Sequence, residues 1–224
     1  EELASFGEND HVGIVSLMDH TPGQRQFRNM DKFKAYVTGK KKLDEEGYRA
    51  HVDMLRDLRE RHGDQHELIT VQEAERLGAV LASHDDTTVE HVATSHSRGI
   101  QIAEFPTTFE AAKACREKGI AIMMGAPNLI RGGSHSGNVS ALELAQNDLL
   151  DVISSDYVPA ALLQSAILLA DLWGDYPRAL RTVTLNPAHA AGLTDRGDIA
   201  LGMRANFVCF ATSGNQGIID RVFV

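Results

Sequence analysis

Histidine and acidic residues that directly follow short apolar runs are the residues of this sequence best suited to do chemistry. His84 follows the apolar run 78–83 and stands beside Asp85 and Asp86. A histidine that leaves a buried strand can offer a neutral ring nitrogen to a metal ion, while an acid or a carbonyl orients its other nitrogen. A solvated loop histidine explains this segment equally well. The sequence therefore predicts two equally supported roles for His84, a metal ligand or a solvated loop histidine.

Asp156 and His20 stand in similar positions. Asp156 follows the run 149–154, where it could bind a metal ion and accept the proton of an activated water. It could instead cap a helix expected from residue 159, since aspartate is a preferred N-cap residue. His20 and Arg25 lie in MDHTPGQRQF, whose Thr-Pro-Gly turn would hold them in a loop after a strand. A ligand or substrate contact there is one interpretation, and turn formation alone is the other.

A third cluster is the segment 125–138, GAPNLIRGGSHSGN. We expect it to be a loop in which the amides of Gly132 and Gly133, two hydroxyls, Arg131 and the capped helix start at Ser140 surround an anion. A flexible glycine- and serine-rich loop is the alternative. The planar guanidinium of Arg131 favours phosphate, because its geometry matches phosphate oxygens.

Apolar runs that alternate with helical periodicity indicate the elements that must position these side chains. Such a chain builds a parallel sheet covered by helices, and the absence of a GxGxxG or Walker A motif removes the simplest support for an open nucleotide-binding sheet. In a barrel, the polar residues after each strand meet at one rim. The runs are 11–18, 78–83, 99–105, 119–124 and 149–154, and the helices are expected at 44–61, 88–98, 108–118 and 140–149.

The pattern changes after Asp156. Two helices at about 159–172 and 177–185 and a short helix at 186–192 are expected, followed by two short strands within 197–210, a loop at 212–217 and a last strand at 218–224. The change of pattern divides the chain into two parts, 1–195 and 196–224.

Composition excludes several functional classes. The chain has 224 residues, of which 43% are hydrophobic, and a formal charge of −9, which disfavours nucleic acid and anionic membranes as partners. Cys115 and Cys209 form no CxxC motif, so neither a disulfide framework nor a thiolate zinc site is indicated. Neither a membrane span nor a signal peptide is visible, so the cytoplasm is the expected compartment.

The motifs MDHTPGQRQF, ASHDDTT, AEFPTT, GAPNLIRGGSHSGN and ISSDYVPA together resemble the amidohydrolase superfamily, and within it the diphosphatases of the carbon–phosphorus lyase pathway. The resemblance implies an α/β fold, a (β/α)8 TIM-type barrel of which strands 4–8 are present here. Residues 1–195 would be the C-terminal part of this barrel, and residues 196–224 would be strands of a small β-sandwich. It implies one or two divalent metal ions at the rim, zinc with manganese or iron as alternatives. His20, His84 and Asp156 would be the metal ligands, and Asp156 would also be catalytic.

The resemblance also implies an activity. The expected function is hydrolysis of a ribose 5-triphosphate phosphonate with release of pyrophosphate, in which Arg25, Glu104, Arg131, Gly132, Gly133 and His135 contact the substrate. A hydrolase of C–N bonds and a non-catalytic metal-binding or assembly protein are the alternatives. A phosphorylated small molecule is the expected partner, and a homo-oligomer is left open. Because the family's first three strands have no counterpart before residue 11, we expect a longer protein.

Overall fold

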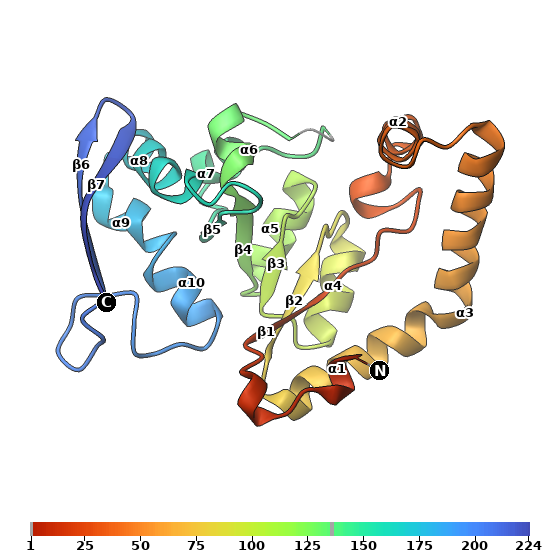
Figure 1. The fold of residues 1–224 in the computed structure, drawn as a ribbon, viewed down its shortest axis with the longest axis horizontal. Coiled ribbons are helices and arrows are strands. Elements are labelled where there is room, and N and C mark those ends of the chain that lie inside the picture. The colour runs from red at the N-terminus through yellow and green to blue at the C-terminus, as the bar shows by residue number, and fades with distance from the viewer. Residues whose placement is uncertain (1, 135–136) are drawn as a thin grey trace.

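The computed structural model describes residues 2–134 and 137–224, and its centre is a parallel five-stranded sheet (Figure 1). The strands lie side by side in chain order, and all four pairings between neighbouring strands are parallel. A doubly wound sheet would reverse its strand order, whereas sequential order is the arrangement of a barrel wall. The predicted α/β class and all five strands are confirmed: β1 (Ile14–Leu17), β2 (Val80–His84), β3 (Ile102–Glu104), β4 (Ala121–Gly125) and β5 (Val152–Ser154).

Three of the connecting helices begin at the caps that the sequence predicts. The side-chain oxygens of Thr88, Thr108 and Ser140 each accept a hydrogen bond from the backbone N–H three residues further on. Each cap satisfies one of the amides that a helix start leaves without a partner. The helices that follow are α4 (Val89–Ser97), α5 (Phe109–Glu117) and α7 (Ala141–Gln146).

The core lies between these helices and the sheet. Ala103, Ile122 and Ile153 of three neighbouring strands are almost fully buried, and so are the helix residues Val92 and Leu144 of the same apolar cluster. A strand that is buried on both faces needs apolar residues at successive positions, which is why these strands read as continuous apolar runs. This packing fixes the carboxyl edge of the sheet.

Two helices between β1 and β2 differ from the prediction. The helix expected at 44–61 is α3 (Glu45–Leu77), which continues to the left-handed cap at Gly78, and Figure 1 shows that it bends along its length. α2 (Met30–Lys41) was not predicted, although Asn29 caps it. Both helices are mostly polar and bury only a small cluster of side chains, so their apolar periodicity is weak: Phe33, Val37, Tyr48 and Val52.

The segment 125–138 is also corrected. We expected a loop, but its first half is the helix α6 (Ala126–Arg131), which has Pro127 in its first turn. Proline is well suited to that position, because the amide it lacks would have no helical partner there. The remaining short elements before β5 are α1 (Glu2–Ser5), η1 (Glu8–Asp10) and η2 (Arg25–Phe27).

The C-terminal part ends in an antiparallel pair of strands. Only one strand forms within 197–210, so the strand expected before Gly202 is wrong, and the predicted loop 212–217 shrinks to a tight turn. β7 packs against α8 at Gly217, where a Cβ atom would lie 2.5 Å from a methyl carbon of Leu163. The elements are α8 (Ala161–Trp173), α9 (Tyr176–Arg181), α10 (Leu185–Ala190), β6 (Phe207–Ser213) and β7 (Gln216–Phe223).

None of the helices in the described part of the chain combines the length and the apolar content needed to cross a membrane. The division at residue 195 stays a prediction.

Candidate metal centre

The carboxyl edge of the parallel sheet brings the candidate residues together. His84 is the last residue of β2 and is the register partner of Glu104, the last residue of β3. Gly125 ends β4 and pairs with Ser154 at the end of β5, two residues before Asp156. His20 follows β1 by three residues. The convergence that the sequence predicted is therefore present.

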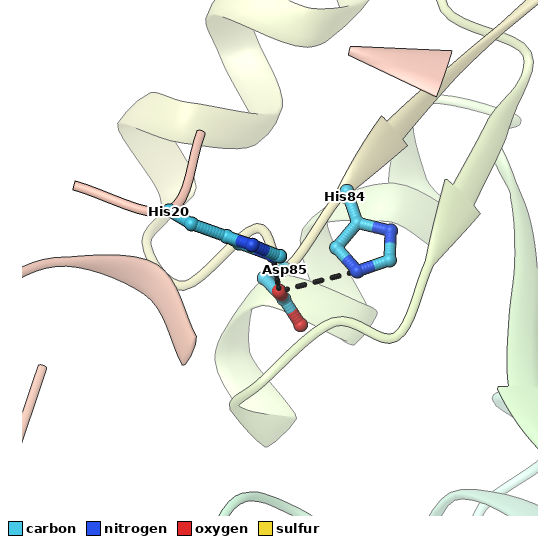
Figure 2. Close-up of side chains that lie close together, drawn as sticks. All are labelled: His20, His84 and Asp85. Atoms are coloured by element: carbon cyan, nitrogen blue, oxygen red, sulfur yellow. Dashed lines mark ion pairs between the residues drawn. The ribbon is translucent and has the colours of Figure 1, made fainter. Parts of the chain in front are cut away.

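Three side chains at this edge point toward one place. Figure 2 shows the side chains of His20, His84 and Asp85 converging. Each offers a ligand atom within 4.8 Å of the other two. The Oδ2 atom of Asp85 lies 3.3 Å from Nε2 of His84 and 3.6 Å from Nε2 of His20. Of the three predicted metal ligands, two are in this cluster, and Asp85 is the member that the sequence reasoning named only as a neighbour of His84.

The environment of Asp85 fits a divalent metal ion. Its side chain is buried, and Oδ2 has no hydrogen-bond partner among the described residues. A buried carboxylate oxygen without a donor is costly unless a cation compensates it. Two imidazole nitrogens and a carboxylate oxygen are ligands that suit zinc, manganese and iron. The donor set and the unsatisfied oxygen together make this cluster a candidate metal site.

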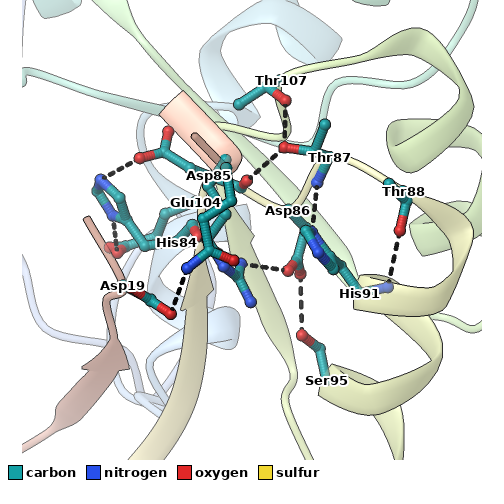
Figure 3. A network of polar contacts seen from close by, with 12 residues as sticks. Asp19, His84, Asp85, Asp86, Thr87, Thr88, His91, Ser95, Glu104 and Thr107 are labelled. Atoms are coloured by element: carbon teal, nitrogen blue, oxygen red, sulfur yellow. Dashed lines mark hydrogen bonds and ion pairs between the residues drawn. The ribbon is translucent and has the colours of Figure 1, made fainter. Parts of the chain in front are cut away.

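Glu104 holds the ring of His84 in place. Its Oε2 atom lies 3.1 Å from Nδ1 of His84 (Figure 3). The same oxygen accepts a 2.5 Å hydrogen bond from the hydroxyl of Ser16. A carboxylate at Nδ1 leaves Nε2 free to bind a metal. The structure thus places Glu104 as a positioning partner of His84, while its predicted contact with substrate stays a prediction.

The charges at the cluster shift the pKa values of both partners. Burial alone would lower the pKa of His84, but the hydrogen bond to Glu104 and the charges of Asp85 and Glu104 outweigh it, so the pKa is raised. Burial would raise the pKa of Glu104, but the hydrogen bonds from His84 and Ser16 lower it below its usual value. In the absence of a metal, these two pKa shifts favour the protonated form of His84 and the ionised form of Glu104.

Asp156 lies at the same edge but outside the cluster of three. Its carboxylate lies over Gly125, where a Cβ atom would be 2.9 Å from Oδ2. It lines a cavity of about 770 Å³ together with His84, Asp85 and Arg131. The predicted catalytic role of Asp156 is compatible with that place, and its role as a metal ligand stays a prediction.

Left-handed backbone recurs at this edge. Asp85, Phe105 and Asp156 have φ values of 58°, 57° and 51°. Non-glycine residues in this region cost about 1–3 kcal/mol each and cluster at functional sites. The turn after each strand thereby redirects the side chain, and for Asp85 and Asp156 that side chain faces the cavity.

Arg25 stabilises the turn after β2 through hydrogen bonds to its backbone and to a buried acid. Its guanidinium donates a 2.7 Å hydrogen bond to Oδ1 of the fully buried Asp86 and a 2.9 Å hydrogen bond to the carbonyl of His84. Asp86 also accepts from the hydroxyl of Ser95 (Figure 3). We expected Arg25 to neutralise substrate phosphates, but this ion pair already neutralises its charge. Its phosphate role stays a prediction that the placement does not favour.

The loop that carries His20 is fixed by Asp19. The carboxylate of Asp19 accepts hydrogen bonds from the amide of Thr21, the side chain of Gln24 and the guanidinium of Arg59. Burial raises the pKa of Asp19, but these donors more than offset it, so the pKa lies below its usual value. An ionised Asp19 therefore ties the His20 loop to α3.

The predicted anion cradle differs from its expected form. The amides of Gly132 and Gly133 donate to the carbonyls of Leu129 and Asn128, and so they end α6. The guanidinium of Arg131 donates a 2.7 Å hydrogen bond to the hydroxyl of Tyr157 and lines the same cavity as His84. His135 lies outside the described residues. The phosphate contacts of this segment stay predictions.

Comparisons with known proteins add one strong similarity. No family model matches the chain. The chain is 47% identical over 219 residues to the alpha-D-ribose 1-methylphosphonate 5-triphosphate diphosphatase of Escherichia coli strain K12. The match covers 96% of this chain and 58% of that relative, so the chain spans less than two thirds of the relative's length. The resemblance that the motifs predicted is confirmed.

Two solved structures share only part of the fold. An uncharacterized protein is 20% identical with a TM-score of 0.49, covering 64% of this chain and 41% of that one. An uncharacterized metal-dependent hydrolase from Pyrococcus horikoshii OT3 is 14% identical with a TM-score of 0.46, covering 63% of this chain and 35% of that one.

Proposed function

We propose that this protein is part of a metal-dependent diphosphatase that hydrolyses a ribose 5-triphosphate carrying a phosphonate at C1. The observation that carries the proposal is the cluster of His20, His84 and Asp85 at the carboxyl edge of the sheet. The 47% identity to the diphosphatase of E. coli supports the choice of substrate. Release of pyrophosphate is the proposed outcome.

His20, His84 and Asp85 would hold a divalent ion through two ring nitrogens and one carboxylate oxygen. Such an ion supplies Lewis acidity, which lowers the pKa of a water molecule and stabilises charge on phosphoryl oxygens. Zinc is proposed, with manganese or iron as alternatives, in one or two copies. Glu104 would accept a hydrogen bond from Nδ1–H of His84, so that Nε2 is the nitrogen that loses its proton when the metal binds.

The chain's own side chains supply the proton transfer and the orientation. Asp156 faces the cavity that His84 and Arg131 line, so its carboxylate would take the proton of the attacking water. The water oxygen bonds to the α-phosphorus, the bond from that phosphorus to the bridging oxygen breaks, and pyrophosphate leaves. Arg131 would stabilise the negative charge that grows on the phosphoryl oxygens.

The test is product analysis with the intact gene product. The ribose triphosphate is incubated with divalent metal in ¹⁸O-enriched water, and the products are followed by ³¹P NMR and mass spectrometry. We expect pyrophosphate, with the label in the ribose 5-phosphate product. His84→Ala should abolish turnover, while His96→Ala, on the exposed face of α4, should retain it.

Other outcomes would contradict the proposal. Release of orthophosphate would mean that a different bond is cleaved. An unchanged triphosphate would leave the C–N hydrolase and the non-catalytic metal-binding protein as the remaining interpretations.

A further inference from the structure

A second cavity, of about 860 Å³, lies beside the metal-ligand cluster. His20 lines it at one side, and the inner faces of α2 and α3 form the other. Phe27 and Tyr36 line both this cavity and the one that contains His84, so the segment before α2 and α2 itself separate the two spaces. A ligand bound at the cluster therefore has this second cavity as its neighbour.

The arginines that line the second cavity are already paired with acids. Arg25 pairs with Asp86, and Arg59 pairs with Asp19 at 2.9 Å. Arg98 forms an ion pair with Glu67. These three ion pairs stabilise the fold, and the carboxylates largely compensate the charge of the arginines.

Lys40 and Lys41 differ from these arginines. Within the described residues, neither ammonium group has a carboxylate within 4.0 Å. The Nζ atom of Lys40 lies 3.2 Å from the hydroxyl of Tyr36, and that of Lys41 lies 3.2 Å from Nε2 of His51. Two adjacent positive charges thus have neutral partners, in a chain of formal charge −9.

His51 orients Lys41 toward the cavity. An ammonium group can only donate, so Nε2 of His51 is the acceptor and must be unprotonated. Burial lowers the pKa of His51, and the charge of Lys41 lowers it further, which keeps that nitrogen available. The arrangement preserves the full charge of Lys41 for an external anion.

A chain of contacts connects these lysines to the metal-ligand cluster. The ring of His20 lies 5.4 Å from that of Phe27, which lies 5.6 Å from the ring of Tyr36. The Nζ atom of Lys40 lies 5.4 Å from the centre of the same Tyr36 ring. Long, flexible lysine side chains at the end of this chain suit a compact, highly charged group more than a planar one.

We propose that Lys40 and Lys41, positioned by Tyr36 and His51, bind the terminal phosphates of the substrate and the pyrophosphate product. The proposal rests on the proposed function for the identity of the substrate. The ligand class itself follows from two uncompensated ammonium groups in a cavity that adjoins a candidate metal centre. Charge-assisted contacts of this kind account for binding of the phosphate end without a contact to the sugar.

Direct binding of pyrophosphate tests the subsite. The intact gene product is titrated with pyrophosphate by calorimetry in the presence of a chelator, so that no divalent metal contributes. Lys40→Gln/Lys41→Gln removes both charges with little change in helix propensity. We expect its affinity for pyrophosphate to fall by about tenfold or more. Lys40→Arg/Lys41→Arg should retain binding.

The matched control removes the same charge elsewhere. Lys113→Gln/Lys118→Gln neutralises two exposed lysines at α5 and should leave the affinity unchanged. Three results would overturn the subsite. The control could lose as much pyrophosphate affinity as Lys40→Gln/Lys41→Gln, this double variant could bind pyrophosphate as tightly as wild type, or wild type could fail to bind it.

Different experimental results would reject the subsite and the proposed function. Lysine-dependent pyrophosphate binding without hydrolysis of the triphosphate would keep the subsite and reject the function. The opposite result would keep the function and reject the subsite. In that case, Lys40→Gln/Lys41→Gln would hydrolyse the triphosphate with an unchanged KM and bind pyrophosphate with unchanged affinity.

Discussion

Asp85 and His84 are the residues on which the candidate metal centre depends most. Asp85 is buried, one of its carboxylate oxygens lacks a donor among the described residues, and its φ of 58° is unfavourable for a non-glycine residue. Both features cost stability in the metal-free protein. A bound cation would compensate the cost of the unsatisfied oxygen.

Glu104→Gln tests how the ring of His84 is held. The substitution keeps the size of the side chain but removes the charge that faces Nδ1, so metal affinity at neutral pH should fall about 10–100-fold. In wild type the metal must displace a proton from His84, whose pKa is raised, so affinity should increase as the pH rises through that pKa. Because Glu104 raises the pKa of His84, the metal affinity of the variant should reach its plateau at a lower pH than that of wild type.

Metal titration at several pH values measures both effects. Glu117→Gln, at the exposed end of α5, is the control and should behave as wild type. Equal affinity in Glu104→Gln and wild type across the pH range would show that Glu104 does not position His84.

The residues of the centre could be predicted unequally from sequence. His84 was recognisable because a histidine after a buried run stands at a strand end, and Asp85 carried the same signal one residue later. The role of Glu104 could not be recognised from the sequence, because it depends on the strand register that pairs Glu104 with His84. The pairing of Arg25 with Asp86 joins residues 61 positions apart and leaves no local trace in the sequence.

At the scale of elements, strand ends determine where the polar groups face. β2, β3 and β4 end side by side, and the turns after β2 and β5 use left-handed backbone to direct Asp85 and Asp156 into one cavity. The close approach of Asp156 to Gly125 is part of this arrangement, because only a residue without a side chain leaves room for the carboxylate.

Gly125→Ala tests that approach. The backbone of Gly125 is extended and accessible to any residue, so the added methyl group should not strain the strand. It would lie 2.9 Å from Oδ2 and 3.3 Å from Cβ of Asp156, so the carboxylate must move. We expect kcat to fall by about 10²-fold or more, as for loss of a general base, with a nearly unchanged melting temperature.

Steady-state kinetics and thermal unfolding check this expectation. Gly13→Ala is the control, because among the described residues a Cβ atom there meets nothing within 4 Å and Gly13 lines neither cavity. Unchanged kcat in Gly125→Ala would show that the placement of Asp156 is not needed for catalysis.

Elements with strong local signals were predicted from sequence. Caps and continuous apolar runs located β2 to β5, α4 and α5 within a few residues. α2 and the second half of α3 were not found, because they bury few side chains and show little apolar periodicity. α6 was missed because the glycines that end it dominate the composition of its segment.

At the scale of the whole molecule, two adjacent cavities share the segment that contains Phe27 and Tyr36. One cavity contains His84, Asp156 and Arg131, and the other contains His20 and the lysines at the end of α2. In the proposed function and the proposed subsite, the reacting phosphate and the terminal phosphates of the substrate would occupy these two neighbouring cavities. The predicted eight-stranded barrel extends beyond the five parallel strands of the described residues and stays a prediction.

Pyrophosphate release during titration of divalent metal into chelator-treated, intact gene product tests the central claim most directly. The rate should be negligible without metal, rise with metal occupancy and reach a plateau in wild type, whereas Asp85→Ala should remain inactive over the same range. A rate that is independent of added metal, or an Asp85→Ala variant with the wild-type response, would contradict a metal-dependent centre at His20, His84 and Asp85.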